Sequence, residues 1–315
     1  MFAGVGGIRL GFEQAFKSDI KTVFVSEWNE NAQKTYKANF YDNFEIAGDI
    51  TQIKEKDIPA FDICLAGFPC VAFSIAGKQQ GFKDNYKGVC RGTLFLDVAR
   101  ICEYHKPKVI FCENVKGLVS HDKGRTFSVI KETFEEIGYK VFYKILNSKD
   151  FGVPQNRERI YIVAFRNDIA PDNFVFPEGS GPYKTIKDIL DPVSITNEFY
   201  ISEKYLNSLK KHKEDNKLKG NGYGYITHSF DDVFQTIVCG GMGRERNLII
   251  DERKGFVSTN SENIRMATPR EFFKAQGFPD NFLLPHKKTV LYKQVGNTVT
   301  VPVIRAIAEE IKKYL

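Results

Sequence analysis

Short apolar runs of strand length alternate with amphipathic helical segments through the first half of the chain. Four runs have the composition of strands: residues 22–26, 61–66, 109–112 and 160–165. Several are apolar on both faces, as strands buried in a parallel sheet are. Residues 92–105 and 127–137 carry apolar side chains at helical spacing, and Gly138 is a typical helix stop. This alternation predicts an α/β sheet with helices on both faces.

The alternation ends near residue 171. Residues 168–192 are rich in Pro, Asp and Gly, and residues 204–219 are rich in lysine. Glycines then recur among short β-prone pieces, and residues 299–315 return to an amphipathic helical pattern. We expect a second, smaller and loop-rich domain after the α/β domain.

Composition excludes several classes of protein. A hydrophobic fraction of 42% with 27% charged residues excludes wholesale disorder and collagen-like or coiled-coil architecture. No uncharged apolar run approaches the roughly 18 residues that a membrane helix needs. The first residues show no basic segment followed by an apolar stretch, so no signal peptide is expected. The net charge of +6 is compatible with a polyanionic partner without requiring one.

The cysteines and histidines show no metal-ligand spacing, so no metal site is predicted. Six cysteines occur without a Cys-x-x-Cys pair: Cys64, Cys70, Cys90, Cys102, Cys112 and Cys239. Without an export signal, they indicate reduced thiols in a cytoplasmic protein. Most are expected to be small buried hydrophobes, Cys64, Cys102 and Cys112 among them.

A glycine-rich turn opens the chain at residues 2–7, directly before a helical pattern over 8–16. Glycines there let a ligand approach the backbone beside a helix N-terminus. Glu27 and Trp28 end the next strand, where a carboxylate could bind ribose hydroxyls and an indole could stack on a base. Asp49 follows the next strand position. The layout suits a nucleoside, although acidic residues at loop ends would show the same pattern.

Cys70 follows the strand at 61–66 through Gly67-Phe68-Pro69, at the carboxyl end where α/β sheets keep their active sites. It is a candidate nucleophile, although a lone cysteine is more often inert. Glu113 ends the next long strand. Arg157 and Arg159 precede another strand, along which alternation could aim both to one side. A thiol, a carboxylate and a guanidinium are therefore expected to converge at one sheet edge.

The ordered blocks of this chain resemble those of the DNA cytosine-5 methyltransferases, especially small bacterial modification enzymes. The resemblance spans the chain except about residues 171–262. Its blocks are residues 2–7, Glu27-Trp28, Gly48-Asp49-Ile50, Pro69-Cys70, Glu113-Asn114-Val115, residues 155–159 and residues 293–297.

The resemblance implies a Rossmann-like fold that uses S-adenosylmethionine and a cytosine flipped out of double-stranded DNA. Cys70 would add to carbon 6 of the ring, which activates carbon 5 for methylation. Glu113 would protonate or hydrogen-bond ring nitrogen 3, and Arg159 would bind the ring carbonyl oxygen. Arg157 would support the site or bind phosphate.

The resemblance also assigns binding residues. For the cofactor they are Phe2, Gly4, Val5, Gly7, Glu27, Trp28, Asp49, Ile50, Pro69, Leu94, Asn297 and Val299. For DNA they are Phe68, Ser74, Lys78, Arg91, Asn114, Tyr223, Thr236, Gly240, Gly241, Arg244 and Arg246. Among these, Thr236 would grip the backbone beside the flipped base, Tyr223 would fill the vacated stack, and Arg244 and Arg246 would read guanine or bind phosphate.

The implied domains are a catalytic and cofactor-binding domain over 1–175, a target-recognition domain over 176–270, and a hinge with a returning helix over 271–315. Two features depart from the family. Val71 replaces the Gln that usually follows the catalytic cysteine. The family's first strand precedes the block at Phe2, so a central strand is expected to be nearly absent, through an internal start or a truncation.

Other functions fit parts of the pattern. A transfer-RNA cytosine-5 methyltransferase shares the fold, but its Cys-Phe-Thr block is missing from this chain. A catalytically inactive DNA-binding relative would not need Cys70, Glu113 and Arg159. A dinucleotide oxidoreductase would use the glycine turn and Glu27 but not Pro69-Cys70. The expected protein is a monomer bound to no metal or membrane, with a cognate restriction endonuclease as its genetic partner.

Overall fold

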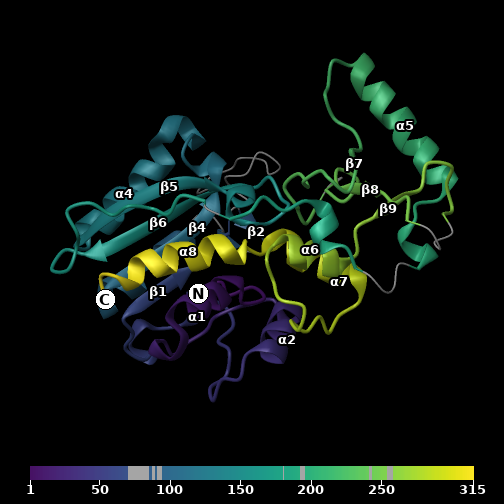
Figure 1. The fold of residues 1–315 in the computed structure, drawn as a ribbon. Helices are drawn as coiled ribbons and strands as arrows, with labels where there is room; N and C mark the ends of the chain where they lie inside the picture. The colour runs from purple at the N-terminus through teal and green to yellow at the C-terminus, as the bar shows by residue number, and fades with distance from the viewer. Residues whose placement is uncertain are drawn as a thin grey trace. The chain divides into compact units, whose positions relative to one another are not determined.

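The computed structural model describes residues 1–69, 85–86, 89–90, 94–179, 181–191, 196–240, 243–253 and 258–315 (Figure 1). The chain forms two compact units. Unit 1 comprises Met1–Asn147, Glu158–Glu178 and Val303–Leu315, and unit 2 comprises Ser148–Arg157 and Gly179–Pro302. The short passage of residues 148–157 into unit 2, between two strands of unit 1, has no counterpart in the sequence prediction.

Unit 1 contains a four-stranded sheet with the order β1 (Ile63–Ala66), β4 (Val109–Val115), β6 (Glu158–Arg166) and β5 (Tyr139–Asn147). β1 and β4 are parallel, with Ile63 opposite Val109, whereas β6 is antiparallel to both β4 and β5. The strands expected at 61–66, 109–112 and 160–165 are present. The expectation of a parallel arrangement is wrong for β6, because it returns from β5 through residues 148–157.

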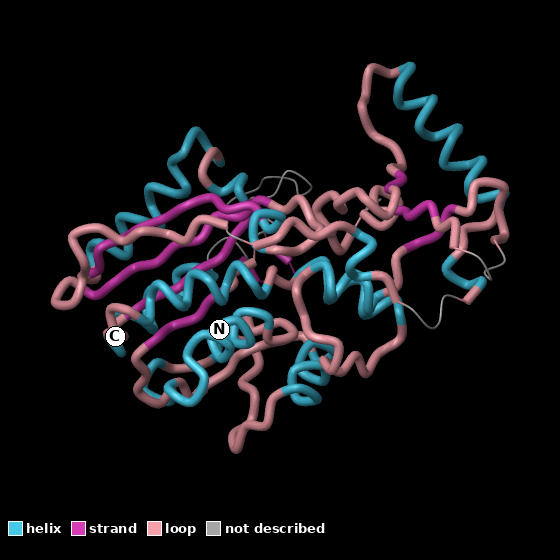
Figure 2. The backbone as a smooth tube through the Cα atoms, viewed as in Figure 1, coloured by secondary structure: helices cyan, strands magenta, loops and turns pink. Residues whose placement is uncertain are grey.

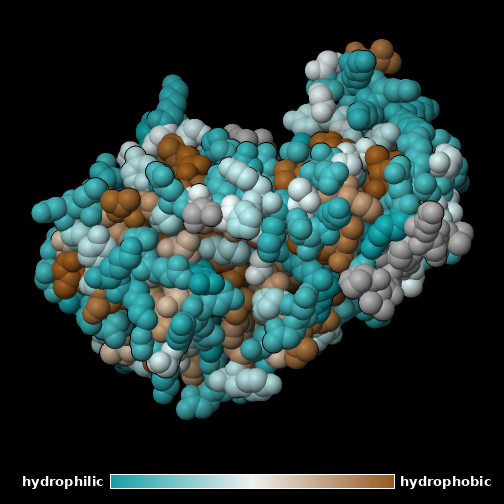
Figure 3. All heavy atoms as spheres, in the orientation of Figure 1, coloured by the Kyte–Doolittle hydropathy of each residue, from teal (hydrophilic) through white to brown (hydrophobic). Residues whose placement is uncertain are grey.

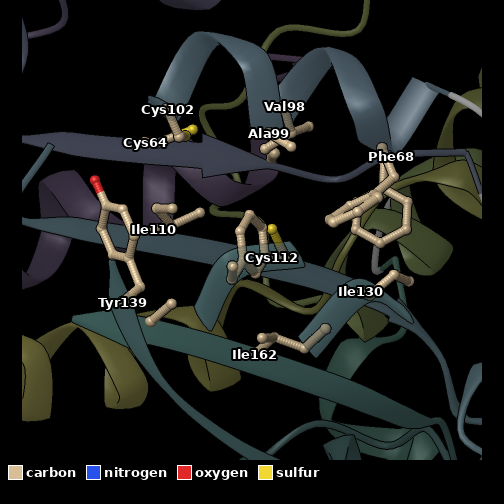
Figure 4. Close-up of a cluster of buried hydrophobic side chains, with 14 of the residues drawn as sticks. Cys64, Phe68, Val98, Ala99, Cys102, Ile110, Cys112, Ile130, Tyr139 and Ile162 are labelled. Carbon is tan, nitrogen blue, oxygen red and sulfur yellow. The ribbon is translucent and has the colours of Figure 1, made fainter. Parts of the chain in front are cut away.

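Helices cover both faces of this sheet, as predicted (Figures 1 and 2). α3 (Leu94–His105) and α4 (Arg125–Glu136) pack on one face, where Cys64, Cys102 and Cys112 lie buried in an apolar cluster (Figure 4). α1 (Gly7–Phe16) and α8 (Val301–Lys312) cover the other face. Their aromatic rings reach the strands: Phe12 packs edge-on to Phe111 at 5.2 Å, and Tyr314, just beyond α8, to Phe165 at 5.4 Å. The cysteines are core residues, as expected.

The strand expected at residues 22–26 is extended but forms only one bridge, between Ser26 and Ala47, within the described part of the chain. A cavity of about 650 Å³ separates this segment from β1, lined by residues that include Val23, Phe24, Ile63 and Leu65. Met1 also lines the cavity, and its ammonium donates to the carbonyl of Leu65 at 2.7 Å.

Unit 2 has a small sheet of β7 (Thr227–His228), β8 (Leu248–Ile250) and β9 (Ile264–Met266), with β7 parallel and β9 antiparallel to β8. Its helices are α5 (Glu203–Leu218), α6 (Pro269–Ala275) and α7 (Lys288–Asn297). A buried ion network joins its elements: Arg265 contacts Asp251 at 2.6 Å and Glu271 at 2.8 Å, and all three side chains are fully buried.

The remaining regular elements are short. Unit 1 also contains α2 (Glu30–Asn39) and the hairpin of β2 (Asn85–Tyr86) and β3 (Val89–Cys90). The 3₁₀ segments are Lys17–Asp19, Ile50–Gln52, Glu55–Asp57, Lys116–Leu118, His121–Gly124, Ser148–Phe151, Ile186–Ile189 and Asn197–Phe199. Among the described residues, no helix is long and apolar enough to cross a membrane.

Candidate active site

The glycine turn at the start of unit 1 adopts backbone conformations that suit glycine. Gly4 and Gly6 have φ angles of 55° and 91°. A Cβ on Gly6 would lie 2.2 Å from the ring of Phe40, whereas a Cβ on Gly4 would meet nothing within 4 Å. The turn leads into α1, whose N-cap residue Gly6 makes no side-chain capping bond. Open space at Gly4 therefore adjoins a helix N-terminus that can bind an anion.

Glu27 closes this turn from the neighbouring extended segment. Its Oε2 accepts a 2.8 Å hydrogen bond from the N–H of Gly4, and its Oε1 accepts one of 2.8 Å from the N–H of Asn29. Burial raises the pKa of Glu27 above its usual value, against the lowering effect of these bonds. The indole of Trp28 beside it is 52% exposed. A polar carboxylate and an open aromatic face thus stand next to the glycine turn.

Three further predicted cofactor residues share one apolar cluster. Ile50 and Leu94 are buried together there, and Phe2 packs against them. Asp49 caps the 3₁₀ segment that starts at Ile50, accepting bonds from the N–H and hydroxyl of Thr51 at 3.0 and 2.9 Å. Val5 is also buried, at 2% exposure. Phe2, Ile50 and Leu94 thus lie in one apolar cluster, and Asp49 directly precedes Ile50.

Glu113 and Arg159 meet at the ends of β4 and β6. Nε of Arg159 lies 3.4 Å from Oε1 of Glu113, and both side chains are 12% exposed. The register explains the contact. Arg159 on the antiparallel β6 stands opposite Val115 on β4, and Glu113 lies two residues before Val115, so its side chain is on the same face of the sheet as that of Val115. A carboxylate and a guanidinium are thereby held together in a largely desolvated setting, where their interaction is stronger than in water.

Asn114 links this pair to the segment that follows β1. Its side-chain amide donates to the carbonyl of Phe68 at 3.2 Å, and its Oδ1 accepts from the N–H of Val115. Phe68 and Asn114 are only 3% and 1% exposed. Both are predicted DNA contacts, and their hydrogen bond holds the chain that leads to Pro69. Pro69 is the last described residue there, and Cys70, Ser74, Lys78, Arg91 and Gly241 lie outside the described residues.

Arg157 is separated from Arg159, contrary to the expectation that both would point to one side. β6 begins at Glu158, and Arg157 belongs to unit 2. There its guanidinium donates to the carbonyls of Ile237 at 2.9 Å and Thr298 at 2.8 Å, with only 3% of the residue exposed. Arg157 therefore ties backbone segments of unit 2 together, a role for which strand alternation gave no signal.

The block at residues 293–297 packs against the segment that carries Thr236. A Cβ on Gly296 would lie 2.3 Å from the backbone nitrogen of Cys239, so only glycine fits there. The hydroxyl of Thr236 donates to the carbonyl of Asn156 at 2.9 Å. Asn297 is exposed and Val299 is 6% exposed, and both belong to unit 2.

The remaining predicted DNA residues of unit 2 are exposed. Tyr223 is 66% exposed, and Gly240 has no neighbour within 4 Å of a Cβ. Arg244 and Arg246 are exposed on the turn that precedes β8, where the guanidinium of Arg244 stands 5.3 Å from the centre of the Tyr292 ring. Arg244 is thus partly engaged within unit 2.

Sequence reasoning missed a buried polar cluster in unit 2. The amide of Gln155 donates to Oε1 of Gln276 at 3.0 Å, while its own Oε1 accepts from the N–H of Ile237. Gln276 also accepts from Thr300, and Thr300 bonds Ser148 at 3.0 Å. Glutamine, threonine and serine carry no spacing signal, so the cluster becomes visible only in the fold. Among the described residues, no group of three His, Cys, Asp or Glu side chains could hold a metal ion.

The chain matches one protein family and several known proteins over nearly its whole length. The family model for C-5 cytosine-specific DNA methylase matches residues 1–313. The type II methyltransferase M.HpaII of Haemophilus parainfluenzae is 48% identical, over 100% of this chain and 88% of its own length. M.HhaI of Haemophilus parahaemolyticus is 40% identical, over 99% and 92%. The methyltransferase EhMeth of Entamoeba histolytica superimposes with a TM-score of 0.78 at 22% identity, over 99% and 96% of the two chains.

Proposed function

The chain belongs to the C-5 cytosine-specific DNA methylase family and is a DNA cytosine-5 methyltransferase, and from this premise we propose how its residues work. The proposed reaction moves a methyl group from S-adenosylmethionine to carbon 5 of a cytosine flipped out of double-stranded DNA. The single observation that carries it is the contact of Glu113 with Arg159 beside the segment leading to Cys70.

The residues of unit 1 suit S-adenosylmethionine. The open space at Gly4 and the uncapped start of α1 would receive the carboxylate of its methionine part. Glu27 would bind the ribose hydroxyls, Trp28 would cover the adenine face, and Asp49 would bind the adenine edge. Phe2, Val5, Gly7, Ile50, Pro69 and Leu94 would line the site, and Asn297 and Val299 would complete it. When bound, this cofactor supplies the methyl group.

Cys70 is the proposed nucleophile. Its thiolate sulfur would form a bond to carbon 6 of cytosine, and the ring electrons would move toward carbon 5 and nitrogen 3. Glu113 would donate a proton or hydrogen bond at nitrogen 3, and Arg159 would bind the carbonyl oxygen. After carbon 5 is methylated, a base such as water would take the proton from carbon 5. The electrons of that bond would restore the double bond between carbons 5 and 6 as Cys70 leaves carbon 6 as a thiolate. The contact with Arg159 supports the placement of Glu113 for this work.

Unit 2 is the proposed DNA-reading part, within a target-recognition region over 176–270, and 1–175 with 271–315 form the proposed catalytic part. Tyr223, Thr236, Gly240, Gly241, Arg244 and Arg246 would contact DNA there, joined by Ser74, Lys78 and Arg91. Because the relatives M.HpaII and M.HhaI are type II methyltransferases of bacteria, we place the protein in the cytoplasm as the modification enzyme of a restriction system. It would act as a monomer beside a cognate endonuclease.

The test is covalent capture on DNA that contains 5-fluorocytosine. Because carbon 5 then carries fluorine in place of hydrogen, the final loss of a proton is blocked and the covalent adduct persists. The wild-type protein should form a denaturation-resistant adduct that depends on S-adenosylmethionine, and Cys70→Ser should form none. Cys239→Ser, which removes another cysteine, is the matched control and should be captured like the wild type. Capture of transfer RNA in place of DNA would favour the alternative substrate. An adduct formed equally by Cys70→Ser would refute the role of Cys70.

A further inference from the structure

Helix α5 of unit 2 is exposed beyond its first half. Its buried residues are Leu206 and Leu209, and no residue of the helix after Leu209 is buried. From Leu209 to Leu218 the helix runs for about 14 Å at 1.5 Å per residue. It projects from β7–β9, and its surface is mainly hydrophilic (Figures 1 and 3). The buried apolar packing of α5 against unit 2 therefore ends at Leu209.

The helix concentrates positive charge. Residues 203–219 contain six lysines and three acidic residues, a net charge of +3 in a chain whose total is +6. Such a density on one exposed element attracts a polyanion, whereas a helix that only needs solubility carries both signs in balance.

The lysines form two rows with different surroundings. Lys210, Lys213 and Lys217 share one side, where Lys210 pairs with Glu262 and Lys213 stands 4.8 Å from the centre of the Tyr225 ring. Their row is turned toward other parts of unit 2. Lys204, Lys211 and Lys219 recur at intervals of seven and eight residues, so they follow another side, and all three are exposed.

The second row, which we call the α5 lysine row (Lys204, Lys211 and Lys219), starts beside the two exposed arginines. The hydroxyl of Tyr205, in the first turn of α5, donates to Oε1 of Glu245 at 3.0 Å. Glu245 is buried between the exposed Arg244 and Arg246 in the chain. This bond fixes the start of the helix next to the turn that carries the two arginines. Asp215 is the acidic residue on that side.

We propose that the α5 lysine row binds the phosphates of duplex DNA that flanks the recognised sequence. The inference rests on the proposed function of unit 2. From Lys204 to Lys219, the residue that follows α5, the row covers 15 residue steps or about 22 Å at the helical rise, a length of roughly six base-pair steps at 3.4 Å each. Because lysine binds phosphate as a point charge and reads no base, the row strengthens binding to every sequence alike.

The experiment compares Lys204→Gln/Lys211→Gln/Lys219→Gln with a matched triple variant of exposed lysines in unit 1, Lys34→Gln/Lys54→Gln/Lys56→Gln. Glutamine forms helices about as well as lysine, so α5 is retained. DNA affinity is measured from 50 to 200 mM salt on a 50-base-pair duplex carrying the methylated site. Each lost phosphate contact makes the negative slope of log K against log salt less steep by about 0.9. The slope should therefore become less steep by about 2–3 in the α5 variant and by less than one in the control.

A second duplex, trimmed to the recognised sequence, should bind the α5 variant and the wild type equally. An unchanged slope on the long duplex would overturn the proposal, as would an equal loss in both triple variants or a loss that persists on the trimmed duplex. Methyl transfer by the wild type is measured on the same preparations. If the wild type methylates DNA while the slopes coincide, only the role of α5 fails. If it methylates no DNA, the proposed function itself fails.

Discussion

The backbone N–H of Gly4 and the carboxylate of Glu27 are joined by a 2.8 Å hydrogen bond between residues 23 positions apart. The bond fixes a carboxylate beside the open space at Gly4. Burial, the largest influence on this group, raises the pKa of Glu27. The fold thus accepts an unfavourable buried charge at the place where a ribose is expected to bind.

Glu27→Gln should weaken S-adenosylmethionine binding by about 10- to 100-fold, since hydrogen bonds to a charged group contribute about 1.5–3 kcal/mol. The variant should also be more stable relative to the wild type at pH 7–8 than it is at pH 4. A carboxyl whose folded pKa is raised contributes stability at low pH that is lost as pH rises through that pKa, and glutamine escapes this loss. Calorimetric titration and thermal unfolding check both parts. Glu30→Gln, an exposed neighbour, should change neither; equal cofactor affinity in all three proteins would contradict the assignment.

Glu113→Gln should slow methyl transfer by about 100- to 10,000-fold at saturating DNA, the usual worth of general acid–base assistance. The fold should persist, because glutamine retains the shape of the side chain at the contact with Arg159. Single-turnover methylation with labelled cofactor measures the rate. The matched control is Glu158→Gln, which removes an exposed carboxylate that pairs with Lys116 at 3.0 Å. Near-normal turnover by Glu113→Gln would exclude a catalytic role.

The sequence predicted the elements whose pattern is local. Runs of apolar residues marked β1, β4 and β6, and helical spacing marked α1, α3, α4 and α8. β5 was missed because Lys140, Lys144 and Asn147 interrupt its apolar residues, and four of its nine residues are exposed. The segment at 22–26 has strand composition but lacks a ladder, because a strand depends on a neighbour that its own sequence does not describe.

The site was predictable where it depends on strand ends and not where it depends on tertiary contacts. Glu113 and Arg159 follow from the position of their strands, and the structure brings them within 3.4 Å. Arg157 differs because it is the last residue of the segment 148–157 that belongs to unit 2, where its guanidinium donates to the carbonyls of Ile237 and Thr298. No periodicity signals such a change of surroundings.

Arg265→Met should destabilise unit 2 by about 3–5 kcal/mol at pH 7, because Asp251 and Glu271 would stay buried without their cation. Burial raises the pKa of Asp251, but hydrogen bonds from Arg253 and Arg265 lower it overall. A lowered pKa contributes stability above the unfolded value near 3.9 that is lost as pH falls through the folded pKa. The cost of Arg265→Met should therefore shrink toward pH 3. Thermal unfolding tests this against Arg305→Met, an exposed ion pair that should cost under about 1 kcal/mol.

Arg244 and Arg246 should differ in their effect on DNA although they stand two residues apart. Arg246 is exposed, whereas the guanidinium of Arg244 lies over the Tyr292 ring and would have to give up that contact. If Arg246 reads a guanine, Arg246→Ala should cost roughly 1–3 kcal/mol on the cognate site and little elsewhere. If it binds phosphate, all sequences should weaken alike and the salt slope should fall by about one unit. Arg244→Ala should show the smaller change of the two.

Tyr223 should behave differently from the two arginines. Its ring is proposed to fill the space that the flipped cytosine leaves in the DNA, and that role does not depend on the DNA sequence. Tyr223→Gly should slow base flipping at every site, seen as a weaker fluorescence change of 2-aminopurine placed at the target, and leave the salt slope unchanged. Affinity for S-adenosylmethionine is the common control, since all three side chains belong to unit 2 and the glycine turn belongs to unit 1. Unchanged DNA binding in all three variants, or a selective loss of cofactor affinity, would show that unit 2 does not read the DNA.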